Sequence, residues 1–307
     1  MGSLWPATSV EDLARLYDYQ DFAHFIQVWI LTTNVMRHAA DFRQLVVDYA
    51  TEAAAHGAVY VEGIFSPGDR AQRGVPWDEI FSGYCEGIVE ARDRCGVEVR
   101  LTPDITRGDP LELVDLATRY AIAYRDRGIV GLGLGGPEAQ HPPQAFAPFF
   151  ERARDAGLGS VPHAGEVGGP ASIRGALEAL HADRLRHGIR ASEDPTLVQE
   201  IVARGVVLDV CLTSNLRTGV VSSLATHPLP ALVAAGVQCS LSTDDPAMFG
   251  TDLKREYAAA ETLGVTPRTL YEAGVAGALC DAATRERLRA IGTAFDWSTV
   301  NGTDTDT

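Results

Sequence analysis

Two short segments in the second half of the chain carry residue types that bind metals and move protons. The segment His163–Glu166 (HAGE) and the pair Asp244–Asp245 each follow a run of small and apolar residues. A neutral imidazole is a common zinc ligand, and a glutamate three residues further on can donate or accept a proton. Two adjacent carboxylates at the end of a buried run are costly unless they bind a cation or accept strong hydrogen bonds.

Each segment also has a purely structural explanation. HAGE is compatible with a loop whose glutamate caps the next helix, and Asp244-Asp245-Pro246 is compatible with an Asx-turn before a helix. His187 is either a structural histidine or a base at a strand end. The hydroxyl and amide groups of 213–215 either bind a ligand or cap a helix. The stretch 135–138 either presents a backbone N–H to a ligand or is a turn.

The elements that must position these residues repeat along the chain: an amphipathic helix, a glycine, a short apolar run and a polar loop. Six runs follow glycines that suit a left-handed helix end, and a seventh, shorter run follows the helix expected over 171–180. The seven runs are Ala58–Ile64, Val97–Ile105, Ile129–Gly135, Leu158–His163, Arg184–His187, Val206–Cys211 and Val237–Ser242. Alternating strands and helices predict a parallel sheet, and barrel enzymes build their sites at the carboxyl ends of such strands. We therefore expect the clusters to form one site, whose residue types suit metal-activated attack of water on a polarised carbon.

Helix signals frame the sheet. An apolar stripe predicts a helix over 21–30, Ser9 with Asp12 resembles an N-terminal cap, and 192–194 is expected to cap a helix that ends near Arg204. We expect one domain over 1–298 and a disordered polar tail over 299–307.

Composition narrows the function. The 307 residues carry a net charge of −15, which argues against a nucleic-acid surface. Five cysteines without a C-x-x-C pair, no long apolar run and no signal peptide lead us to expect a cytoplasmic protein with no membrane span. Nothing in the pattern specifies an oligomeric state.

The motifs, in this order and spacing, resemble those of the adenosine deaminase family of the metal-dependent amidohydrolase superfamily. The matching segments are GLGGPE at 133–138, HAGE at 163–166, R-x-x-HG at 184–188, TSN at 213–215 and STDDP at 242–246. The segment 21–25 (DFAHF) resembles the helical lid of the family, and together with GLGGPE it looks most like actinobacterial members, including aminodeoxyfutalosine deaminases. The resemblance covers nearly the whole chain.

The resemblance implies a (β/α)8 TIM-type barrel that binds one Zn2+ per subunit and hydrolyses an aminopurine to its 6-oxo product and ammonia. His163 and Asp244 would be zinc ligands, Glu166 would protonate the purine ring, and His187 would act as a base. Asp245 and Gly136 would hydrogen-bond the purine, and lid residues Phe22 and Phe25 would cover it. Adenosine, adenine and aminodeoxyfutalosine all share the attacked ring.

One family feature has no match here. The family begins with a strand carrying His-x-His, which supplies two more zinc ligands, whereas the histidines before His163 are isolated ones at 24, 38, 56 and 141. The first β/α unit is therefore expected to be missing. Smaller departures are Leu212, where proline is usual, and Arg186, where a smaller residue is common.

Two hypotheses follow from that absence. In the first, the chain is a zinc-dependent deaminase whose start is truncated. In the second, it is a non-catalytic purine-binding relative, because three protein ligands are the usual minimum for catalytic zinc. For these 307 residues we expect weak metal binding, poor activity and an open barrel with exposed strand edges.

Overall fold

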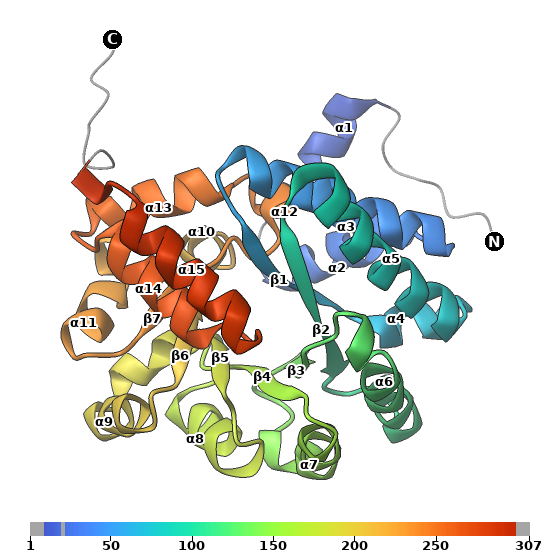
Figure 1. Ribbon diagram of the computed structural model, residues 1–307. Helices are drawn as coiled ribbons and strands as arrows, with labels where there is room; N and C mark the ends of the chain where they lie inside the picture. Colours follow the sequence, from blue (N-terminus) through green and yellow to red (C-terminus); the bar gives the residue numbers. More distant parts are fainter. Residues whose placement is uncertain (1–8, 20–21, 299–307) are drawn as a thin grey trace.

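A computed structural model describes residues 9–19 and 22–298 and shows one parallel sheet that curls into an open barrel (Figure 1). The seven strands follow one another in sheet order, as repeated β/α units require. They are β1 Tyr60–Phe65, β2 Glu98–Thr106, β3 Gly131–Gly135, β4 Gly159–Ala164, β5 Arg184–His187, β6 Val207–Val210 and β7 Cys239–Leu241. All seven expected strands are present, and each begins within two residues of its expected start.

Helices surround the outer face of the sheet. Their bounds are α1 Val10–Arg15, α2 Phe22–Thr33, α3 Ala39–Ala55, α4 Pro67–Gln72, α5 Trp77–Cys95, α6 Leu111–Ala123, α7 Ala147–Asp155, α8 Pro170–Ala179, α9 Pro195–Arg204, α10 Leu212–Arg217, α11 Leu229–Ala234, α12 Pro246–Phe249, α13 Leu253–Thr262, α14 Pro267–Gly277 and α15 Ala282–Ala294. Both expected caps are confirmed. Ser9 Oγ accepts the Asp12 amide at 3.0 Å, and the Asp194 carboxylate accepts the amides of Thr196 and Leu197.

The apolar core lies between the sheet and the helices. Alternate strand residues such as Leu185 and Leu208 point outward into it and are fully buried with Phe42, Phe81 and Phe150 of the helices. Burying such side chains is the main stabilising term of the fold, at about 1.5–3 kcal/mol for each large one.

The inward-facing residues of several strands are charged and paired. Arg184 of β5 donates to Asp209 of β6 and to Glu62 of β1, both at 2.7 Å. Nearer the carboxyl ends, Arg186 of β5 forms an ion pair with Asp104 of β2. Each of these five charged side chains has a partner of opposite charge, which offsets part of the cost of burying it.

The barrel is open between β1 and β7. Among the described residues, neither strand pairs with a further one, so the sheet has seven strands where a closed (β/α)8 barrel has eight. Ile64 of β1 is 45% exposed, which fits an unpartnered edge. The strand count is consistent with the expected absence of one β/α unit.

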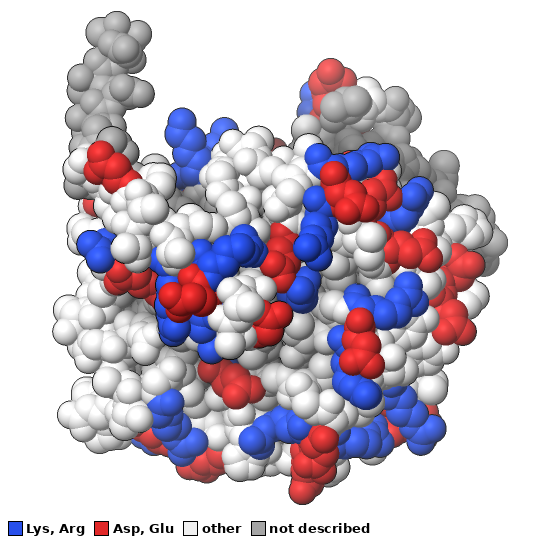
Figure 2. Space-filling view, viewed as in Figure 1, with Lys and Arg blue, Asp and Glu red and all other residues white. Residues whose placement is uncertain are grey.

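The face of the molecule shown in Figure 2 mixes both signs of charge, with lysine and arginine side chains interspersed among aspartate and glutamate. A phosphate-binding surface would need clustered positive charge, whereas the basic side chains of this face lie among acidic ones. Across the described parts of the chain, no helix is both long enough and apolar enough to cross a membrane.

Candidate active site

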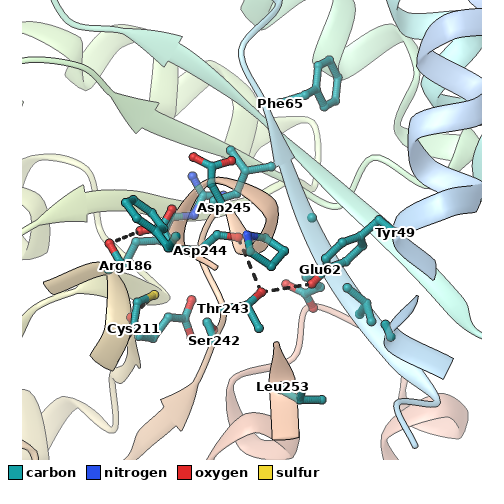
Figure 3. A pocket seen from close by; sticks show the side chains of 18 of the residues that line it. Tyr49, Glu62, Phe65, Arg186, Cys211, Ser242, Thr243, Asp244, Asp245 and Leu253 are labelled. Carbon is teal, nitrogen blue, oxygen red and sulfur yellow. Dashed lines mark hydrogen bonds between the residues drawn. The ribbon is translucent and has the colours of Figure 1, made fainter. Parts of the chain in front are cut away.

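The polar clusters line a single cleft of about 2290 Å³. Its lining includes His163, Glu166, His187 and Asp244, together with β1 on the opposite side (Figure 3). Ligand pockets usually enclose about 300–1,000 Å³. The cleft is larger because it continues into the gap between β1 and β7, whose residues also line it.

His163, the penultimate residue of β4, has one ring nitrogen already engaged. Its Nδ1 lies 3.1 Å from the carbonyl oxygen of Leu134 and 3.2 Å from the Asp104 carboxylate. Burial alone would raise the pKa of Asp104, but Arg186 and His163 hold it below its usual value. A carboxylate behind Nδ1 leaves Nε2 of His163 as the free lone pair, which is the usual arrangement of a metal-binding histidine.

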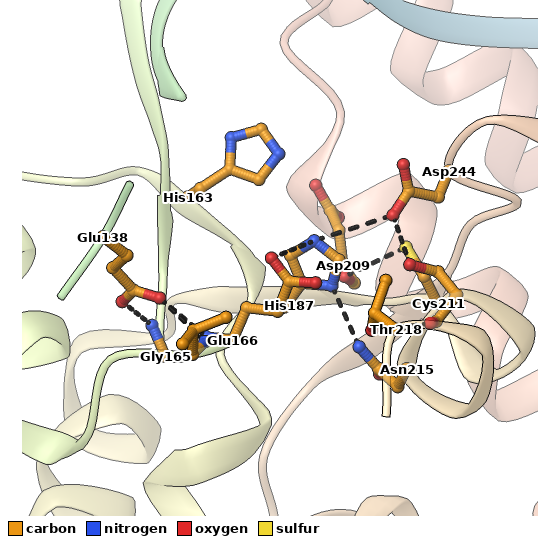
Figure 4. Close-up of polar contacts among 12 residues, drawn as sticks. Glu138, His163, Gly165, Glu166, His187, Asp209, Cys211, Asn215, Thr218 and Asp244 are labelled. Carbon is orange, nitrogen blue, oxygen red and sulfur yellow. Dashed lines mark hydrogen bonds and ion pairs between the residues drawn. The ribbon is translucent and has the colours of Figure 1, made fainter. Parts of the chain in front are cut away.

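Glu138 fixes the turn that carries Glu166. Its carboxylate accepts four consecutive backbone amides, from 165 to 168, at 2.5 to 3.2 Å (Figure 4). The buried Arg107 below it donates to the carbonyl oxygen of His163 at 2.6 Å. The backbone on both sides of HAGE is therefore held by charged side chains, which makes the direction of Glu166 a fixed property of the fold.

His187 and Asp244 both adopt left-handed backbone conformations. Their φ angles are +62° and +56°, and only one other non-glycine residue in the described chain, His181, has a positive φ. Such strain is uncommon and concentrates at functional sites. It turns the imidazole of His187 into the cleft, where Nε2 lies 3.6 Å from Glu166 and 3.8 Å from Asp244.

The carboxylates of the site have altered acidity. Burial raises the pKa of Glu166, and the neighbouring Asp244 raises it further. Burial and Asp244 also raise the pKa of Asp245 to about 7. A carboxyl group whose pKa is raised binds a proton more readily, which suits it to passing a proton to a substrate.

The donor atoms closest to one another belong to His187, Cys211 and Asp244, and they all lie within 4.8 Å. Burial and Asp244 raise the pKa of Cys211 well above its usual value, so its sulfur is a thiol. Ser214 Oγ donates to the Asp244 carboxylate at 2.6 Å and orients it. Within the described residues, His163 is outside this close group, although the resemblance pairs it with Asp244 as a ligand.

The residues expected to contact substrate are placed as follows. Gly136 has φ +87°, and a Cβ there would lie 3.0 Å from the carbonyl oxygen of Arg107, so only glycine fits. Phe25 of α2 lines the cleft and stacks on Phe249 of α12, with ring centroids 4.9 Å apart. Helix α2, which the resemblance assigns as a lid, thus packs against the segment that follows Asp245. The side chain of Phe22 and the tail 299–307 lie outside the described residues.

Sequence reasoning missed the residues that support the site. The sequence places Glu138 in the GLGGPE motif without predicting a role for it, and it predicts only a strand around Asp104. The signal for Asp104 was a carboxylate within an apolar run, which demands a buried partner. Arg186, a departure from the family pattern, is that partner, and it also donates to Thr102 Oγ1.

A parallel barrel-type sheet with polar side chains at or after the carboxyl ends of β2 to β7 is the architecture of an α/β barrel enzyme. The chain belongs to the adenosine deaminase family, since the family model "Adenosine deaminase" matches residues 2–291. It is therefore a hydrolase of that family.

Individual relatives agree with this assignment. Aminodeoxyfutalosine deaminase from Acidothermus cellulolyticus is 54% identical over 98% of this chain and 87% of its own length. The crystal structure of adenine deaminase from Arthrobacter aurescens superimposes with a TM-score of 0.89 at 30% identity, over 94% of this chain and 89% of that one. An amidohydrolase from Burkholderia ambifaria, solved with bound Zn, shares the fold at 24% identity (TM-score 0.83, 89% and 78% covered).

Proposed function

We propose that this protein hydrolyses the amino group of an adenine-bearing small molecule, with aminodeoxyfutalosine as its substrate. The observation that carries the proposal is the convergence of Glu166, His187 and Asp244 on one cleft, with Nε2 of His187 within 4 Å of both carboxylates. The 54% identity to an aminodeoxyfutalosine deaminase favours that substrate over adenine and adenosine, which carry the same ring.

The chemistry adds water across the ring carbon that carries the amino group, and the carbon then expels ammonia to leave the 6-oxo ring. Glu166 delivers a proton to the adjacent ring nitrogen, which its raised pKa favours. His187 faces the attacking water, and Asp245 and Gly136 hold the far edge of the purine. The packing of Phe25 against α12 covers the ring from the lid side.

His163 and Asp244 would each suit Zn2+ as a ligand, with one ion per subunit. Nε2 of His163 is free because Nδ1 faces Leu134 and Asp104, and the Asp244 carboxylate is oriented by Ser214. Nitrogen and oxygen donors of this kind bind zinc. When bound, the cation supplies Lewis acidity that makes water a better nucleophile at neutral pH.

A second function, purine binding without turnover, is favoured by one observation. In the described chain, His163 does not belong to the close donor group of His187, Cys211 and Asp244. A cation held by so few protein ligands binds weakly, whereas purine binding through Asp245 and Gly136 would not require the cation.

The test uses the 307-residue chain incubated with Zn2+ and, separately, with aminodeoxyfutalosine, adenine and adenosine. Ammonia release and zinc content by elemental analysis are measured, with Glu166→Gln as the inactive control. Release from aminodeoxyfutalosine that exceeds release from the other two, and that requires Glu166, supports the proposal. Binding of all three purines without ammonia, and without stoichiometric zinc, supports the second function instead.

A further inference from the structure

A chain of three buried side chains runs from the loop before α11 to the active-site histidine. His227 Nε2 lies 3.2 Å from Asn215 Oδ1, and Asn215 Nδ2 lies 3.3 Å from His187 Nδ1. All three side chains are at most 4% exposed. His227 and Asn215 play no part in the proposed chemistry. Asn215 nevertheless contacts the ring nitrogen of His187 that faces away from the cleft, and His227 contacts Asn215.

The direction of every hydrogen bond in this chain is set by one group that can only donate. The backbone amide of Leu229 donates to His227 Nδ1 at 3.1 Å, so Nδ1 carries a lone pair. Burial lowers the pKa of His227 to about 4, so at neutral pH the ring is uncharged and its single proton is on Nε2.

The proton position on His227 then fixes the hydrogen-bond directions at Asn215 and His187. The Nε2–H of His227 requires the oxygen of the Asn215 amide, which leaves the NH2 group of Asn215 facing His187. That group donates, so His187 Nδ1 must accept. A neutral His187 consequently has its proton on Nε2. Reversing any one bond would place two donors or two acceptors in contact inside the protein, at a cost of about 1–3 kcal/mol.

We propose that His227 and Asn215 are positioning residues that hold neutral His187 as its Nε2–H tautomer, with that N–H directed into the cleft toward Glu166 and Asp244. The consequence for catalysis rests on the proposed function. His187 orients the attacking water as a hydrogen-bond donor and does not accept its proton. The proton passes to Glu166, whose Oε2 is 3.6 Å from Nε2, and from there to the ring nitrogen.

The tautomer is measured directly on the full chain labelled with 15N-histidine, because a protonated ring nitrogen resonates far upfield of one with a lone pair. Two-bond proton–nitrogen correlation spectra are recorded above the ordinary imidazole pKa, and His187 is assigned by its absence in His187→Gln. We expect a protonated Nε2 and an unprotonated Nδ1. A protonated Nδ1 on neutral His187 would overturn the proposal.

Two variants test the relay with opposite expectations. Asn215→Asp presents only acceptors, so Nδ1 of His187 should become protonated. His227→Gln keeps a donor near the position of Nε2, so the tautomer should stay as in the parent. An unchanged tautomer in Asn215→Asp, with a native-like unfolding transition, would overturn the relay.

Activity provides an independent readout. Asn215→Asp should lower kcat at least tenfold with little change in KM, and His227→Gln should retain most of kcat. A preparation with the expected tautomers and no ammonia release from any aminopurine would refute the proposed function and leave the relay intact. Equal kcat in the parent and Asn215→Asp, with the tautomer inverted, would refute the donor role of His187.

Discussion

Replacing His227 by glutamine should flatten the acid side of the stability curve. The ordinary histidine pKa is 6.5, and burial lowers that of His227 to about 4 in the folded protein. Between these values the unfolded chain binds a proton that the native state does not. Stability present above pH 6.5 is therefore lost as the pH falls toward 4, by about 3 kcal/mol in total at 1.36 kcal/mol per pKa unit.

The assay is urea unfolding of the parent chain and of His227→Gln at several pH values, followed by tryptophan fluorescence. All other titrating groups are shared, so they cancel in the difference between the two proteins. The variant should be less stable at pH 7, because the Leu229 amide loses its acceptor. The parent's advantage should then shrink by about 3 kcal/mol on going to pH 4. A difference that stays constant within about 1 kcal/mol would show that His227 is not a buried neutral group.

Three substitutions elsewhere test other parts of the structure. Glu138→Gln weakens the hydrogen bonds to four backbone amides of the site and should lower kcat, measured by ammonia release, about tenfold. The control Glu151→Gln, on the surface of α7, should leave kcat unchanged. Equal rates in the two variants would contradict the positioning role of Glu138. Asp194→Ala removes the cap of α9 and should cost about 1 kcal/mol in urea unfolding, and no loss would show that the cap is redundant. Phe81→Ala opens a fully buried site and should cost about 3–5 kcal/mol in the same assay; a loss below about 1 kcal/mol would mean that the core collapses around it.

The strands were predictable because their signals are local. Each is a short apolar run, and six of them follow a glycine that the structure places at positive φ, as at Gly96 and Gly205. The cap of α9 was predictable for the same reason, since Asp194 binds amides only two and three residues away. Local patterns of this kind can be recognised in the sequence without knowledge of the tertiary structure.

The interior pairs were not predictable, because the partners are far apart in sequence. Arg186 and Asp104 are separated by 82 residues, and only the curling of the sheet brings them together. The relay of His227, Asn215 and His187 was not predictable either. No local pattern marks His227, and the sequence predicts only a ligand or a helix cap at Asn215. The expected pairing of His163 with Asp244 as metal ligands remains a prediction, since the close donor group contains Asp244 without His163.

The ion pair between Glu62 and Arg184 constrains the order in which the strands of this chain can become buried during folding. The two residues are 122 positions apart, so during synthesis β1 is complete long before its counter-charge exists. Before β5 is synthesised, burial of the Glu62 carboxylate is not compensated by Arg184. Strand β1 can then pair only with β2. Among the seven described strands, β1 should therefore be among the last to become protected from hydrogen exchange, although it is synthesised before the other six.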